Sequence, residues 1–161
     1  MPIEEKSFDY IRRARKNEWQ KVIKFTWCVF SECNARFYSE EGIASFRDYL
    51  SNPELKKLFD ENKYIVYFAI REGEIAGLIA LRYWTHIALL FVSPSSQKTG
   101  IGTQLILKCA GLIKKRYDVD YITVNAAPTA EEFYRNIGFR REGKMSLTNG
   151  MPIMPMKLYI S

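Results

Sequence analysis

At 161 residues, with 47% hydrophobic and 14% aromatic residues, the chain is long enough for one domain with a sizeable core. We expect no membrane-spanning helix, because no apolar run reaches about eighteen residues, and no secretory signal, because residues 1–6 have no apolar stretch. The net charge is +6, and the 24 basic and 18 acidic residues are mixed along the chain. Such a surface could bind the phosphates of a nucleotide cofactor as well as nucleic acid, so the charge alone does not favour either ligand. We therefore expect a single cytoplasmic domain over residues 1–161.

Helical patterns dominate the first third of the chain. Residues 10–14 have the character of a short strand, and the apolar residues of 19–30 recur at intervals of three and four, which predicts a helix. A second helix is expected to begin near Ser39 and to end at 52–53, where an Asn-Pro pair stands. A further helical turn should cover 54–60.

The pattern then changes to that of strands. β-Branched and aromatic residues over 64–70 and 75–81 flank a turn around Gly73, which predicts a hairpin. The almost purely apolar run 86–92 is typical of a central strand that is covered on both faces. Pro94 ends this strand, because proline cannot donate to a sheet ladder.

The C-terminal part alternates helices and strands. A helical apolar stripe begins at Ile101, a strand is expected over 121–125, a short helix over 130–135, and a final hairpin around 149–150. The strand–helix–strand order from 86 to 125 predicts a parallel pair with a right-handed crossover. We therefore expect a mixed α/β fold, with a twisted sheet of six or seven strands flanked by about four helices.

Two glycines lie between the strand 86–92 and the helix that follows it. The first turn of a helix leaves unpaired N–H groups and a partial positive charge, and Gly100 and Gly102 allow a phosphate to approach that backbone without meeting a Cβ atom. Lys98 adds a full positive charge. The P-loop pattern is absent, and the dinucleotide fingerprint would need a glycine where Leu105 stands. The segment is therefore a candidate pyrophosphate site of another kind.

The segment from Gln97 to Gly102 resembles the Q/R-x-x-G-x-G/A motif of the GNAT acetyltransferases. Downstream, residues 130–139 resemble the second signature of that family, a helix that carries Phe-Tyr and is followed by Gly-Phe. The two motifs stand in the family's order and at its usual separation, across one strand. The resemblance is strongest over residues 64–139.

The resemblance implies a GNAT-type sheet in which the parallel strands 86–92 and 121–125 splay apart and the pantetheine arm of acetyl-CoA lies between them. It implies that this arm pairs with strand backbone, that the amides of 98–103 hold the pyrophosphate, and that Tyr134 donates a proton to the departing CoA thiolate. The positions matching the family's coenzyme site are Phe91, Val92, Gln97, Lys98, Thr99, Gly100, Ile101, Gly102, Thr103, Asn125, Phe133 and Tyr134.

Two alternatives stay open for His86, the single histidine of the chain. By strand alternation it shares a face with Val92, and in the histone-modifying branch of the family the matching residue is a glutamate that acts as the base. His86 is therefore a candidate catalytic base. A histidine that simply packs at the end of a strand fits the sequence equally well.

The resemblance implies an acceptor site between the first two helices, where Tyr38, Glu40, Glu41, Phe46 and Tyr49 stand. Two carboxylates there would suit a cationic amine, although the same residues also fit a helix cap and a solvated face. No metal is expected, because Cys28 and Cys33 lack the partners of a zinc site.

We therefore predict an N-acetyltransferase that moves acetyl from acetyl-CoA to a primary amine, with a small-molecule acceptor favoured over a protein. Acetyl-CoA and the amine are the expected partners, with no nucleic acid and no membrane, and the apolar C-terminal hairpin allows a homodimer. The alternatives are a catalytically silent CoA-binding sensor and a basic nucleic-acid-binding module, which would bind with a steep salt dependence.

Overall fold

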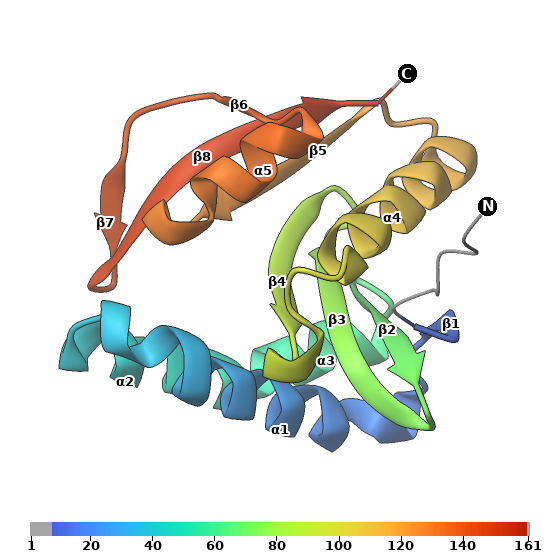
Figure 1. Ribbon diagram of the computed structural model, residues 1–161, viewed down its shortest axis with the longest axis horizontal. Helices are drawn as coiled ribbons and strands as arrows, with labels where there is room; N and C mark the ends of the chain where they lie inside the picture. The colour runs from blue at the N-terminus through green and yellow to red at the C-terminus, as the bar shows by residue number, and fades with distance from the viewer. Residues whose placement is uncertain (1–7, 161) are drawn as a thin grey trace.

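The computed structural model describes residues 8–160, so the expectation of no secretory signal in residues 1–6 lies outside it. Within the described range, eight strands form one mixed sheet, and five α-helices cover it (Figure 1). The predicted mixed α/β fold is confirmed. The sheet has more strands than expected because the two-residue strand β6 is too short to leave a pattern in the sequence.

Seven of the strands are arranged in the order β1-β2-β3-β4-β5-β8-β6, and β7 pairs with β8 outside this path. Every neighbouring pair is antiparallel except β4 and β5, which are parallel. The strands are β1 (Tyr10–Arg13), β2 (Tyr64–Arg71), β3 (Glu74–Arg82), β4 (His86–Val92), β5 (Tyr121–Ala126), β6 (Arg140–Arg141), β7 (Ser146–Thr148) and β8 (Met151–Tyr159).

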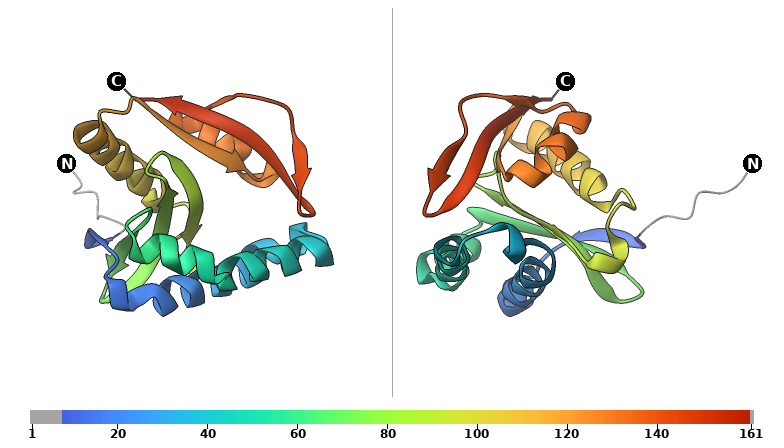
Figure 2. Two further views of the ribbon diagram at one scale, coloured as in Figure 1. Left: turned by 180° about the vertical axis from the view of Figure 1, so that it is seen from behind. Right: turned by 60° about the vertical axis from the view of Figure 1, so that its left-hand side comes forward.

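The helices lie in two layers, one on each face of the sheet (Figure 2). Helices α1, α2 and α3 share one hydrophobic core with the sheet, and α4 and α5 share the other. The helices are α1 (Trp19–Val29), α2 (Glu40–Ser51), α3 (Pro53–Asp60), α4 (Ile101–Tyr117) and α5 (Glu131–Ile137).

Local sequence signals explain where α2 and α3 begin. The Ser39 side chain accepts a hydrogen bond from the Gly42 amide at 3.1 Å, which caps α2. The Asn52 side chain accepts from the Glu54 amide at 3.0 Å, and Pro53 occupies the first position of α3. The predicted boundary at 52–53 therefore separates two helices.

The parallel strands β4 and β5 pair at only two positions, His86 with Thr123 and Ile87 with Val124. Beyond them the two strands diverge, as Figure 1 shows. The predicted splayed central pair is confirmed. From Ala88 onward, β4 has no ladder partner on its β5 side within the described sheet.

The register between β3 and β4 skips one residue, Ala88, so β4 contains a β-bulge. Because of this extra residue, Ile87 and Val92 pack against the same core although an odd number of positions separates them. His86 therefore faces away from Val92. The prediction that His86 and Val92 share a face is wrong, because simple alternation does not hold across a bulge.

Glu18 joins the start of α1 to β1. Its side chain is only 4% exposed and accepts hydrogen bonds from the Arg12 guanidinium at 2.7 and 2.8 Å and from the Arg15 amide at 2.8 Å. The hydrogen bonds from Arg12 are the main cause that lowers the pKa of Glu18 from 4.5 to about 2. The ionised Glu18 carboxylate therefore contributes its full stabilisation of the fold at pH values above the ordinary glutamate pKa of 4.5.

Glu18→Gln should lower the free energy of unfolding at pH 7 by on the order of 2–3 kcal/mol. The folded-state pKa is lowered, so the contribution of Glu18 is present above pH 4.5 and is lost as the pH falls toward about 2. Urea unfolding of both proteins across this range should show the difference shrinking with acidification. A difference that stays constant from pH 7 to pH 3 would contradict this account.

Candidate active site

The N-terminus of α4 forms an open backbone site beside a tight loop. No side chain of residues 8–160 caps this helix, and the Thr99 hydroxyl donates to the Ser96 carbonyl instead. Gly100 has a φ of +90°, and a Cβ atom placed on it would meet nothing within 4 Å. Because the first amides of an uncapped helix attract anions, this arrangement fits a phosphate group.

The other residues of the predicted coenzyme segment, Gln97 to Thr103, differ in exposure and in role. Lys98 is exposed, with a φ of +63°, and Thr103 is half-buried in the first turn of α4. Ile101 is buried in the core and anchors the helix. The Gln97 side-chain amide donates to the Val92 carbonyl at 3.1 Å, which ties the loop to the end of β4.

Gly102 brings the two sequence motifs into contact. A Cβ atom at this position would lie 3.1 Å from Cζ of Phe133 and 3.9 Å from Cγ2 of Val92. We expected this glycine to leave space for a phosphate, but the structure directs its missing side chain at the aromatic ring. Gly102 therefore allows α5 to pack against the start of α4.

Gly77 on β3 is a residue that our sequence analysis missed. A Cβ atom there would lie 2.9 Å from Cγ2 of Ile101, 3.3 Å from the Phe91 carbonyl oxygen and 3.4 Å from Cδ1 of Leu105. The glycine therefore allows α4 to begin close against the sheet. The available signal was a glycine inside a strand, which often marks a close approach.

A cavity of about 330 Å³ lies between the diverging ends of β4 and β5. The splay opens the sheet here, so side chains from both layers reach the cavity. The lining near the strands is formed by Ile87, Ala88, Leu89, Leu90, Phe91, Val124, Asn125, Ala126, Ala127, Ala130 and Tyr134. The cavity therefore includes Phe91, Asn125 and Tyr134 of the predicted site.

Tyr134 enters this cavity from α5. Its ring packs edge-on against Phe133 and Phe139, with centroids 5.1 and 5.3 Å apart, and the side chain is buried. Burial raises the pKa of the Tyr134 phenol well above its ordinary value. The hydroxyl is protonated at neutral pH, as it is at the ordinary tyrosine pKa, and can act as a proton donor.

The opposite end of the cavity is formed by α2, the segment before it, and the β7–β8 hairpin. Tyr38, Ser45 and Tyr49 line it on the helix side, and Thr148 and Asn149 line it on the hairpin side. The hairpin tip lies against the start of α2 (Figures 1 and 2). A Cβ atom on Gly42 would come within 3.1 Å of the Gly150 carbonyl oxygen. The tip therefore closes this end of the cavity.

The two carboxylates predicted for the acceptor site do not line the cavity, although the Glu41 side chain packs against Gly150 of the hairpin tip. Glu40 and Glu41 are exposed in the first turn of α2, and neither lines the cavity. Of the five residues expected at the acceptor site, the structure brings Tyr38, Phe46 and Tyr49 to the cavity.

The family model of the GNAT acetyltransferase domain matches residues 34–160, which is most of the chain. The chain belongs to the GNAT acetyltransferase family. No curated protein sequence matches it. Within the described residues, no helix is long and apolar enough to cross a membrane, and no three His, Cys, Asp or Glu side chains group as metal ligands would.

Solved GNAT structures share the fold at low sequence identity. A GCN5-related N-acetyltransferase of Rhodopseudomonas palustris is 21% identical, with a TM-score of 0.81 over 99% of this chain and 100% of its own. The PaiA N-acetyltransferase of Thermoplasma acidophilum, solved with coenzyme A, is 21% identical, with a TM-score of 0.73 over 93% and 98% of the two chains. A spermidine N-acetyltransferase of Vibrio cholerae, solved with CoA and spermine, is 14% identical, with a TM-score of 0.64 over 93% and 94%.

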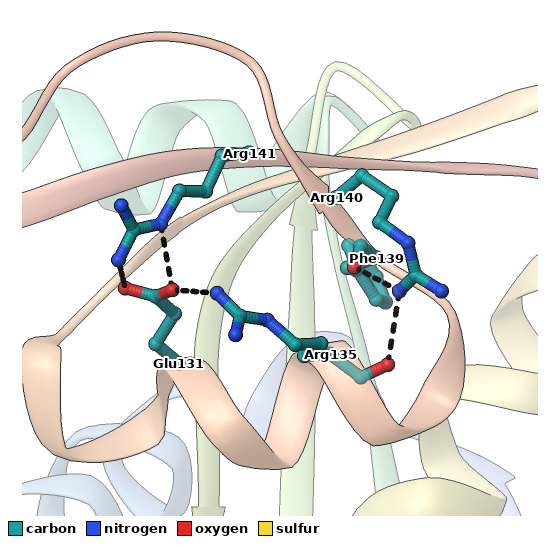
Figure 3. A network of polar contacts seen from close by, with 5 residues as sticks. All are labelled: Glu131, Arg135, Phe139, Arg140 and Arg141. Carbon is teal, nitrogen blue, oxygen red and sulfur yellow. Dashed lines mark hydrogen bonds and ion pairs between the residues drawn. The ribbon is translucent and has the colours of Figure 1, made fainter.

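An ion-pair network holds α5 of this GNAT domain in position (Figure 3). Glu131 accepts hydrogen bonds from Arg141 at 2.7 and 2.9 Å and from Arg135 at 2.5 Å. Arg140 donates to the carbonyls of Arg135 at 3.2 Å and Phe139 at 2.9 Å. The network joins both ends of the short helix to β6, and β6 pairs with β8. It thereby fixes the helix that carries Tyr134.

His86 lies at the point where β4 and β5 separate. Its Nδ1 is 2.8 Å from the Thr123 hydroxyl, and it does not line the cavity. Burial, followed by the charge of Arg82, lowers the pKa of His86, so the ring is neutral at neutral pH. The role of base stays a prediction, and the geometry supports a second role, in which His86 links the two strands at the base of the splay.

His86→Ala removes the hydrogen bond with Thr123 and is expected to lower the free energy of unfolding by about 1 kcal/mol, the net value of one hydrogen bond. The melting temperature should fall accordingly. Because the ring does not line the cavity, the shape of the pH–rate profile should match that of the parent. Both profiles should be measured from pH 6 to pH 10 with a saturating amine. Lower activity near neutrality that recovers toward alkaline pH would instead assign His86 as the base.

Proposed function

We propose that this protein transfers the acetyl group of acetyl-CoA to a primary amine of a small molecule. The contact between Gly102 and Phe133 carries the proposal, because it joins the open start of α4 to the helix that holds Tyr134. A phosphate-binding element and a buried proton donor then serve one ligand. The complexes of related folds with coenzyme A and with spermine are consistent with this proposal.

The chain offers matching groups for each part of the coenzyme. The uncapped amides of residues 101–103, with Lys98 beside them, would hold the pyrophosphate. The unpaired edge of β4 from Ala88 would offer backbone groups to the pantetheine amides, with Asn125 on the opposite wall. When bound, acetyl-CoA supplies an acetyl group activated as a thioester.

Two groups of the protein would assist the reaction, a backbone N–H of β4 and the Tyr134 hydroxyl. An amine would attack only after it loses one proton, and its nitrogen would bond to the thioester carbon. The carbon–sulfur bond would then break, and the nitrogen would release its extra proton to the solvent. A free N–H on the β4 edge can donate to the carbonyl oxygen as negative charge develops there. The Tyr134 hydroxyl can give its proton to the departing sulfur and then recover one from the solvent.

The proposal is tested by titrating the protein with acetyl-CoA in a calorimeter and by following thiol release with a mixed amine library. We expect saturable binding and release of CoA that depends on added amine. Binding without amine-dependent release would favour the silent sensor. Failure to bind acetyl-CoA, together with salt-sensitive binding to DNA or RNA, would favour the nucleic-acid module.

A further inference from the structure

The acceptor end of the cavity is built around five packed aromatic rings. The centroids of Phe30 and Phe46 are 4.4 Å apart, and Tyr38, Tyr49 and Phe91 extend the cluster at 5.6 to 6.2 Å. All five rings line the cavity. The rings come from α2, β4 and the segment between α1 and α2, so three separate parts of the fold form this wall.

The polar side chains that line the cavity at this end are uncharged, and Glu41, which packs against Gly150 of the hairpin tip, is not among them. Asn34, Ser45, Thr148 and Asn149 supply amides and hydroxyls, and among residues 8–160 every side chain that lines the cavity is neutral. The phenols of Tyr38 and Tyr49 are also neutral, and burial raises their pKa further above its ordinary value. These groups can orient one amine nitrogen by hydrogen bonds.

This lining discriminates between classes of amine by charge. A polyamine brings two or more ammonium groups, and each loses hydration on entering and needs a carboxylate in return. The aromatic faces can accept one cation, and further ammonium groups would stay unpaired. An amine on an aromatic or branched apolar body instead buries that body against the rings.

The same environment favours the reactive form of the amine. Desolvation among apolar side chains disfavours an ammonium ion and lowers its pKa. A single amine that enters this end is therefore shifted toward the neutral form, which attacks the thioester. A carboxylate beside it would oppose that shift.

We propose that the acceptor is a monoamine carried on an apolar, aromatic body, and that the site discriminates against polyamines. This inference rests on the proposed acetyl transfer and adds the class of acceptor to it. The spermidine N-acetyltransferase that shares the fold therefore does not indicate the acceptor of this chain.

The test compares 2-phenylethylamine with spermidine by the rate of thiol release and, separately, by calorimetric binding to the protein saturated with CoA. We expect kcat/KM for 2-phenylethylamine to exceed that for spermidine by about tenfold or more, as a difference of about 1.4 kcal/mol in recognition would produce. Binding should follow the same order.

A carboxylate introduced into the cavity should reverse this preference. Ser45 lines the cavity from α2, whereas the adjacent Ala44 is exposed on the same helix. Ser45→Asp should reduce the kcat/KM ratio of phenylethylamine to spermidine by about tenfold or more. Ala44→Asp adds the same charge outside the cavity and should leave the ratio within about twofold of the parent.

The outcomes separate this inference from the proposed function. Release of thiol that is faster with spermidine would overturn the acceptor class and leave acetyl transfer standing. Phenylethylamine binding without any thiol release would refute the transfer and support the site. Binding of neither amine, or equal ratios for Ser45→Asp and Ala44→Asp, would overturn the inference.

Discussion

Tyr134→Phe is expected to lower kcat for acetyl transfer by about 10²–10⁴-fold, with little change in acetyl-CoA affinity. The substitution removes one hydroxyl and keeps the ring that packs between Phe133 and Phe139. The phenol is protonated at neutral pH, as a tyrosine is at its ordinary pKa, so the parent protein holds the proton that the leaving thiolate needs. The loss should therefore fall on the chemical step.

Single-turnover kinetics and calorimetry of acetyl-CoA binding measure the two effects separately. Tyr121→Phe is a matched control, since Tyr121 lies on β5 and does not line the cavity. Tyr121→Phe also removes one phenolic hydroxyl, but outside the cavity, and should leave kcat unchanged. If the single-turnover rate of Tyr134→Phe equals that of the parent, Tyr134 packs the site but does not donate the proton.

Gly77→Ala is expected to weaken acetyl-CoA binding by about tenfold or more, although Gly77 belongs to neither motif. The added methyl would lie 2.9 Å from the Ile101 side chain, and Ile101 is buried and cannot swing aside. The start of α4 must therefore move away from β3, which displaces the amides that would hold the pyrophosphate. Overpacking of this kind also costs about 1–3 kcal/mol of stability.

Gly111→Ala is the matched control for this prediction. Gly111 lies within α4, and a Cβ atom there would meet nothing within 4 Å. We expect unchanged affinity and a gain in stability of about 0.5–1 kcal/mol, as usual for glycine to alanine in a helix. Calorimetry measures the acetyl-CoA affinity of the three proteins, at a temperature where circular dichroism shows that all of them are folded. Equal affinity of Gly77→Ala and the parent would disprove the proposed role of Gly77.

Local signals in the sequence were sufficient for most of the fold. The Ser39 cap, the boundary at 52–53 and the glycine after α5 depend on neighbours a few residues away, so they can be recognised in the chain itself. The order of the segments from 86 to 125 predicts the parallel pair, because parallel strands need a long crossover connection, usually a helix. Both motifs were recognisable for the same reason, since each is contiguous.

The details of the site depend on contacts between distant segments, and the sequence alone did not indicate them. The bulge at Ala88 depends on the register with β3 and reverses the face of His86. The neutral lining of the acceptor end depends on how α2 and the β7–β8 hairpin pack, which places Glu41 against Gly150 of the hairpin tip and leaves both Glu40 and Glu41 out of the cavity lining. The sequence by itself therefore determined the helices, all strands except β6, their order in the chain and the family. Only the tertiary structure decided which side chains surround the cavity, because packing between layers sets those positions and no local pattern records it.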